Sequence, residues 1–429
     1  MGKVCGLFLL FGALTALAAA EKPDAEALAK DLKAAKAGER IAAAKALNDL
    51  SPEVAAVVPQ LVEALKDEYF DVRLNSAAAL AKLGAKVVPA LRQALRDENH
   101  YSQSNAARIL ARIGPPAKEA LPELGKLLAA GSQDLQLDAA EAVLAIGDSQ
   151  PVARELLNAL SSSSEGVRSA AARALGRTGK AVLPELIQLL AHKDPGVVSA
   201  AARALGEIGP EAASAAPLLA KALLEESRRV GEELAKVGEG GIRDSRLRHA
   251  LRGSDILPVF SKLGAAAAPP LIEALKDADD NRTCWVLEAL GRTGSGAAPA
   301  LPTLLGIAKG GGDLGNRARA LGAIGAIGPE AASAVPSLIG ALECEGKEEI
   351  LARYAAGALA KLGAAAVKPL AEALQSRHPH VRRQAATALG QIGPAAKEAE
   401  AALRKAAEDG EETVRKAAQE ALAALKPKE

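Results

Sequence analysis

The segment VPQLVEALKDEYFDVRLNSAAALAKLG, residues 58–84, decides the fold of this chain. Pro59 suits the first turn of a short helix, because the N–H that proline lacks would be unpaired there anyway. A polar turn with Asp67 follows, and apolar residues at helical spacing predict a second helix over about 72–83. Gly84 then supplies the left-handed residue past the helix end. The segment therefore predicts one helix pair, too small to bury its own apolar stripe.

The same pattern recurs along nearly the whole chain. Each copy ends in a motif close to A-L-x-x-[IL]-G or an Arg-Thr-Gly variant, and neighbouring copies lie mostly 30 to 35 residues apart. The glycines that end the copies are Gly84, Gly114, Gly147, Gly179, Gly209, Gly264, Gly294, Gly328, Gly363 and Gly393. Because each unit can bury its stripe only against similar neighbours, the repeat predicts an all-α fold, a right-handed α-solenoid of about thirteen stacked helix pairs.

Residues 221–262 fit this repeat least well. They lie in the longest step between motif glycines, 55 residues, which Gly238 divides into two short units. Charged residues are concentrated at 225–229, and Pro258 falls inside the expected second helix of its unit. We interpret the segment as two degenerate repeats, and the alternative is a hinge or a specialised recognition segment.

Two segments carry a resemblance to a known family. Residues 166–176 read GVRSAAARALG and residues 381–393 read VRRQAATALGQIG. Both resemble HEAT repeats of the phycocyanobilin-lyase type, and the resemblance extends over nearly everything after the first twenty residues. It implies a HEAT-like superhelix and is specific for fold but not for function.

The resemblance also implies a polar ladder, in which a turn aspartate and a helix arginine link successive repeats. The matching aspartates are Asp67, Asp97 and Asp277, and the matching arginines are Arg40, Arg73, Arg168, Arg317, Arg382 and Arg415. Gln103, Gln136 and Val198 occupy the arginine position in three other units. We therefore expect an interrupted ladder.

Residues 1–20 have the features of a secretory signal peptide. Lys3 gives a positive start, a mostly apolar run follows, and three small residues end at Ala20. The run is too short to span a bilayer comfortably, and Cys5 stands at its start, where it is misplaced for a lipid anchor. We predict cleavage after Ala20, export to the periplasm or the extracellular space, and a repeat solenoid over residues 21–429. The alternative is an ordinary buried N-terminal helix.

The composition disfavours several classes of partner. Loss of Lys3 with the signal leaves 52 basic residues against 52 acidic ones, and aromatics make up only 2% of the chain. A nucleic-acid binder usually has a basic excess and stacking aromatics, so no nucleic-acid partner is expected. No later run is long and apolar enough for a membrane span, and we expect a monomer.

The two cysteines beyond the signal should not form a disulfide. Cys284 and Cys344 lie two repeats apart. Stacked helices are about 8–10 Å apart, whereas a disulfide requires Cα atoms within about 7 Å. The fold is therefore expected to form without covalent cross-links.

The sequence contains no recognisable catalytic constellation, and we predict no cofactor or metal. Residues 310–315 spell G-x-G-x-x-G, but a helix rather than a strand is expected before them. His378 and His380 share a turn, and no Cys or carboxylate cluster stands beside them in sequence, which favours a solvated turn over a metal site. No histidine precedes a glutamate, as iron-dependent hydroxylases built from such repeats would need.

A row of arginines is the best candidate for partner binding. The positions six and two before the motif glycine should face solvent on the second helices. They hold Arg108 and Arg112, Arg173 and Arg177, and Arg203. Like charges four residues apart cost about 0.2–0.5 kcal/mol, so helix stability does not explain these pairs. They are interpreted as a stripe that grips acidic groups, with an ordinary solvated face balanced by nearby acids as the alternative.

These observations favour a non-catalytic scaffold outside the cytoplasm that binds protein partners through an extended surface. The first alternative is a lyase-like or other enzyme subunit, which the resemblance leaves open. The second is a structural spacer with no partner at all.

Overall fold

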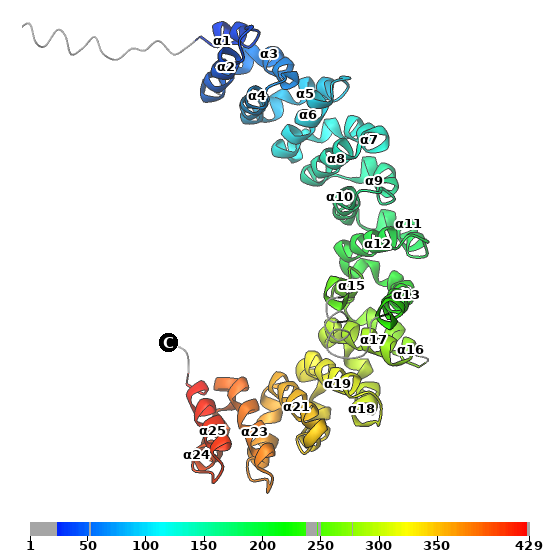
Figure 1. Ribbon diagram of the computed structural model, residues 1–429, viewed down its shortest axis with the longest axis vertical. Helices are drawn as coiled ribbons and strands as arrows, with labels where there is room; N and C mark the ends of the chain where they lie inside the picture. Colours follow the sequence, from blue (N-terminus) through cyan, green and yellow to red (C-terminus); the bar gives the residue numbers. More distant parts are fainter. Residues whose placement is uncertain (1–23, 51–52, 237–246, 248–249, 277, 427–429) are drawn as a thin grey trace, which may run out of the picture. The chain divides into compact units, whose positions relative to one another are not determined.

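A computed structural model describes residues 24–50, 53–236, 247, 250–276 and 278–426 (Figure 1). Within these ranges the chain forms helices and no strand, which confirms the all-α fold class. The chain divides into two compact units that meet at residues 174 and 175. The expected signal peptide and its cleavage after Ala20 lie outside the described residues.

The first unit consists of paired helices. They are α1 (Ala25–Asp31), α2 (Ala37–Leu50), α3 (Val58–Glu63), α4 (Phe70–Lys82), α5 (Val88–Ala94), α6 (His100–Ile113), α7 (Leu121–Ala130), α8 (Gln133–Ile146) and α9 (Ala153–Ala159). Short 3-10 helices connect them: η1 (Glu53–Val57), η2 (Ala64–Lys66), η3 (Gly84–Val87), η4 (Pro115–Ala120) and η5 (Gln150–Val152). Helix α10 (Glu165–Gly176) lies across the division between the units.

The second unit continues the pattern. Its helices are α11 (Leu183–Leu189), α12 (Pro195–Ile208), α13 (Ala216–Ala235), α15 (Leu257–Leu263), α16 (Ala268–Ala274), α17 (Asp280–Thr293), α18 (Leu301–Lys309), α19 (Leu314–Ile327), α20 (Val335–Ala341), α21 (Glu349–Leu362), α22 (Ala364–Ala373), α23 (Pro379–Ile392), α24 (Glu400–Ala406) and α25 (Glu412–Ala424). Its 3-10 helices are η6 (Gly179–Val182), η7 (Gly209–Ala215), η8 (Gly264–Ala267), η9 (Gly294–Ala300), η10 (Gly328–Ala334), η11 (Gly346–Glu348) and η12 (Gly393–Ala399).

Within each unit the second helices of successive pairs stack on one another. Helix α6 packs against α8 in the first unit, and α19 packs against α21 and α23 against α25 in the second (Figure 1). The core repeats as well: Leu61, Leu124 and Leu304 occupy the same place in their first helices, and each is fully buried. Burial from both neighbours is what stabilises pairs too small to fold alone.

The motif glycines adopt the positive φ that the sequence predicts. The values run from 59° at Gly84 to 85° at Gly147. Gly147, with ψ of −5°, lies in the left-handed helical region that was expected for all of them. At Gly114 ψ is −138°, a combination that essentially only glycine adopts, and the chain turns directly into a 3-10 helix that leads to the next pair.

The irregular segment is described only in part, because residues 237–246, 248 and 249 lie outside the described residues, and its two short units stay a prediction. Among the described helices, α15 packs between α12 and α17, and α13 packs on α16 and α17. Helix α13 is 20 residues long, far longer than the other first helices. Pro258 stands in the first turn of α15 rather than inside a helix, because a proline is tolerated only where no N–H is required.

A candidate binding groove at the interruption of the repeat

The arginine that several second helices carry at the ladder position binds the turn of its own repeat. The guanidinium of Arg73 donates to the carbonyl oxygens of Asp67 and Glu68 at 2.7 and 2.9 Å. Arg168 donates to Ser162 and Ser163 at 2.8 and 3.2 Å, and Arg415 repeats the arrangement in the last helix, α25. These bonds satisfy carbonyl groups that a tight turn leaves without backbone partners.

Some of these arginines also reach an acid in the turn of the next repeat. Arg40 forms an ion pair with Asp67 at 2.7 Å, and Arg382 forms one with Asp409 at 2.7 Å. Arg317 pairs with Glu348, an acid that the resemblance did not include. The bond from Arg382 holds the pKa of Asp409 below its usual range. Both members of the Arg40 and Arg382 pairs are largely buried, so these contacts are less screened than surface pairs.

The link expected between Arg73 and Asp97 is not formed. Asp97 instead pairs with Lys66 at 2.8 Å, and this bond lowers the pKa of the carboxyl. The guanidinium of Arg73 lies over the ring of Tyr101, 4.1 Å from its centroid, where a cation–π contact replaces the ion pair. Asp277 lies outside the described residues.

Val198 interrupts the arginine positions in α12, and a groove lies beside it. Its side chain has no donor for the carbonyls of the turn at 192–193. Where glutamine takes this position the contact survives in another form, because Gln136 donates to the carbonyl of Leu128 at 3.1 Å. Next to Val198 the long helix α13 passes the α11–α12 turn, and a groove with a volume of about 740 Å³ lies between them.

We call this hollow the α13 groove. It is lined by Leu190, Ala191, His192, Lys193, Pro195, Gly196, Val198, Ser199, Leu218, Lys221, Ala222, Leu224, Glu225, Glu226, Arg228, Arg229, Ile256 and Arg282, all in the second unit. Its size is in the range of pockets that hold ligands or several side chains of a bound peptide.

The cations that line the α13 groove differ in whether an acid pairs with them. In the part of the chain that the structure describes, no acid forms an ion pair with Lys193, Lys221 or Arg229. Arg228, by contrast, is held by Glu225 at 2.5 Å and by Glu232. The groove therefore combines apolar residues with three cations that have no ion-pair partner among the described residues, and the charge of Arg229 also acts on Glu225 and Glu226.

One acid of the α13 groove is shielded from water. Glu226 accepts a hydrogen bond from the Ser254 hydroxyl at 2.7 Å, and burial raises the pKa of its carboxyl while that bond partly opposes the shift.

Two members of the arginine row pair with acids of a neighbouring repeat, the balance by nearby acids that the alternative interpretation predicted. Arg108 is exposed, but its Nε donates to buried Asp138 on α8 at 2.8 Å, and Ser104 donates to the same carboxylate at 2.5 Å. Arg203 pairs with Asp255 at 2.8 Å. These two guanidinium groups stabilise contacts between repeats, because an acid on the next repeat lies within reach.

The other members of the row are exposed on their helices or just beyond them. Arg112 stands on α6 and Arg173 on α10, and Arg177 follows the end of α10. Arg173 and Arg177 fall on opposite sides of the division between the two units.

Sequence reasoning identified the segment of the α13 groove but not the groove. The charge cluster at 225–229 and the loss of arginine at Val198 were both visible in the sequence. What could not be read from it is that α13 extends to 20 residues and passes beside the turn that Val198 leaves uncovered.

The stacked pairs define a helical repeat protein. A family model described as HEAT repeats matches residues 25–101, 153–236 and 336–423, more than half of the chain, and the chain therefore belongs to the HEAT-repeat family. The finer resemblance to the phycocyanobilin-lyase type stays a prediction.

Solved structures with the same fold include the karyopherin Kap121p in several complexes. Kap121p bound to Nup53p is 16% identical with a TM-score of 0.62, covering 97% of this chain and 51% of that one. Kap121p bound to Ste12p is 15% identical with a TM-score of 0.62, covering 97% of this chain and 51% of that one. Kap121p bound to RanGTP is 16% identical with a TM-score of 0.58, covering 97% of this chain and 50% of that one. This chain thus spans about half the length of these proteins, and at such identity the likeness shows the fold alone. No curated protein matches the chain.

Two further findings bear on the sequence predictions. Cys284 and Cys344 are both free, as the repeat spacing predicted. Among the described helices, none combines the length and the apolar character that a membrane span requires.

Proposed function

We propose that this protein is a non-catalytic scaffold that binds an acidic polypeptide segment in the α13 groove. The observation that supports it most is the groove itself, which lies where a side chain of the repeat is missing and a first helix is lengthened. Repeat proteins of this architecture present extended surfaces suited to binding.

The lining of the groove indicates the chemistry of the partner. Leu190, Leu218 and Leu224 offer apolar surface, and Lys193, Lys221 and Arg229 offer positive charge around it. A peptide segment that alternates carboxylates with one or two apolar side chains would contact both the apolar surface and the cations. Nucleic acid fits less well, because Glu225 and Glu226 stand in the same groove and none of its lining residues is Phe, Tyr or Trp, on which bases stack.

Photocrosslinking tests this proposal in the native host. The photoreactive amino acid p-benzoylphenylalanine replaces Val198 or Leu224 inside the groove, and Leu74, 48% exposed in the first unit, serves as the matched control. A protein adduct at the two groove positions and not at the control is expected. Absence of an adduct, or an adduct that nuclease removes, would contradict the proposal.

A charge reversal tests the acidic character of the partner. We expect Lys221→Glu with Arg229→Glu to abolish the adduct, because both cations would then repel a carboxylate. Lys45→Glu with Lys86→Glu makes the same change of charge at exposed positions in the first unit and should leave the adduct intact. Equal adduct yields from the two double variants would mean that groove charge plays no part.

We further propose that the protein acts outside the cytoplasm. The support is the pattern of residues 1–20, with its apolar run and small-residue cleavage site. The intact mass of protein purified from the native host should correspond to a chain that begins at Glu21, recovered in the periplasmic or extracellular fraction. A chain that still begins at Met1 and fractionates with cytoplasmic markers would refute export.

A further inference from the structure

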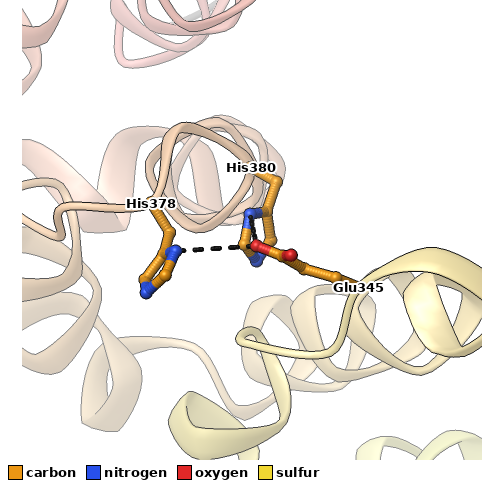
Figure 2. A group of neighbouring side chains, drawn as sticks. All are labelled: Glu345, His378 and His380. Carbon is orange, nitrogen blue, oxygen red and sulfur yellow. Dashed lines mark ion pairs between the residues drawn. The ribbon is translucent and has the colours of Figure 1, made fainter.

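Three side chains of types that bind metal ions lie close together where two repeats of the second unit join. Glu345 lies in the turn between α20 and α21, and His378 and His380 lie at the start of α23 in the next repeat (Figure 2). One carboxylate oxygen and one nitrogen from each ring all lie within 4.8 Å of one another. The Oε1 atom of Glu345 is 3.0 Å from Nδ1 of His380 and 3.5 Å from Nδ1 of His378.

This junction has lost the side chains that usually link repeats. The ladder position of α21 holds Ala352, which is fully buried and carries no donor. The turn position that holds Asp67 or Asp409 in other repeats holds Ser376 here. The same junction therefore lacks both members of the usual ion pair and carries three other polar side chains instead.

The histidines do not stabilise their helix in the usual way. Six of the described second helices are preceded by an Asp, Asn or Ser whose side chain accepts a backbone N–H; these residues are Asn99, Ser132, Ser164, Asp194, Asp279 and Asp313. His378 occupies this position in α23 and makes no such bond. Pro379 separates it from His380, and the two ring centroids are 5.5 Å apart. Helix capping therefore does not explain why the two histidine rings stand at this position.

The surroundings of the rings select one nitrogen from each. The Nε2 atom of His380 is buried and has no hydrogen-bond partner among the described residues, so an ion cannot approach there. The Nε2 atom of His378 accepts a bond from Arg377 at 3.0 Å. Both Nδ1 atoms face the carboxylate of Glu345 (Figure 2), and the side chain of Glu345 is 61% exposed.

We propose that Glu345, His378 and His380 form a Zn²⁺ site that joins two successive repeats. Zinc accepts imidazole nitrogen and carboxylate oxygen at about 2.0–2.2 Å in tetrahedral geometry, which places neighbouring ligand atoms roughly 3.3 Å apart. The separations of 3.0 and 3.5 Å are close to this value. Water completes the fourth position on the exposed side. The sequence did not reveal the site because its carboxylate comes from the preceding repeat.

The geometry also assigns an opposing role to Arg377. When Nδ1 of His378 binds zinc, its Nε2 carries the proton and faces the Nε–H donor of Arg377. The two donors repel, and the guanidinium adds a positive charge beside the cation. Arg377 is exposed and can turn away into solvent, at a cost to affinity. Arg377→Ala should therefore bind zinc more tightly than the wild type.

Competition against a chromophoric zinc chelator tests the site, with the full mature chain carrying no histidine tag and with Zn²⁺ as the only added ligand. We expect one ion per chain and a rise in the melting temperature with zinc, because the ion binds the folded state. His378→Ala, His380→Ala and Glu345→Gln should each weaken binding about 100-fold or more, since even loss of a supporting contact costs about 10–100-fold. Circular dichroism confirms that each variant is folded.

Two control variants identify the source of any zinc signal. His100→Ala removes an exposed histidine at the start of α6, and Cys344→Ser removes the more accessible thiol; neither should change the affinity. If the wild type binds no zinc, if binding survives His378→Ala together with His380→Ala, or if Cys344→Ser abolishes it, the proposal is overturned. The readout does not involve the α13 groove, so the two proposals can fail separately.

Discussion

Restoring the missing arginine should stabilise the repeat and close the groove. In the variant Val198→Arg the new guanidinium is placed as in Arg168, whose NH groups reach the carbonyls six and five residues earlier. At position 198 these are the carbonyls of His192 and Lys193, which line the α13 groove. The same side chain would then fill the mouth of the groove with an additional positive charge.

The expected gain in stability is the contribution of the new hydrogen bonds less the entropy lost when the arginine side chain is ordered. Two hydrogen bonds contribute about 0.5–1.5 kcal/mol each, and ordering a long side chain costs about 1.5–2 kcal/mol at most. Val198 is only half-buried, and arginine methylenes can cover the surface that it covers. With both bonds near the upper end of that range, the expected net stabilisation is about 1 kcal/mol, equivalent to a fivefold change in the opening equilibrium.

Hydrogen exchange and photocrosslinking together measure the two effects. Amides in α12 should be protected about fivefold more strongly in Val198→Arg, because local opening becomes rarer. The protein adduct formed through position 224 should be lost. Val198→Ile keeps the groove apolar and should change neither quantity by much. Unchanged protection combined with a retained adduct would refute the view that the absence of arginine opens the groove.

The remaining predictions concern thiol reactivity, pH and core packing. Burial raises the pKa of the Cys284 thiol to about 11, so iodoacetamide should label Cys344 well before Cys284 at pH 8, and equal labelling would contradict the burial of α17. The pKa of Glu226 is raised, so the folded state holds its proton longer than the unfolded state does, and stability should fall as pH rises through the titration; Glu226→Gln, which can still accept from Ser254, should remove that slope in denaturation measured from pH 4 to pH 8. Leu304→Ala removes a fully buried side chain and should cost about 2–5 kcal/mol in urea unfolding, against at most about 0.5 kcal/mol for exposed Leu74→Ala.

The sequence alone determined the features that depend on neighbours along the chain. The helix pairs, the positive φ at Gly84 and the reach of Arg73 to its own turn all follow from helical geometry and from the properties of single residues. Such features recur from copy to copy because the local spacing recurs. This is why the fold class and the absence of a disulfide could be predicted.

Only the tertiary structure decided which side chains meet between repeats. Asp97 pairs with Lys66 rather than with Arg73, and buried Asp138 engages Arg108. Glu345 meets two histidines of the following repeat. These contacts depend on how far each helix is displaced against the next and on where α13 ends. Packing against several neighbouring helices at once determines these displacements, and they cannot be predicted from the residue spacing within a single repeat.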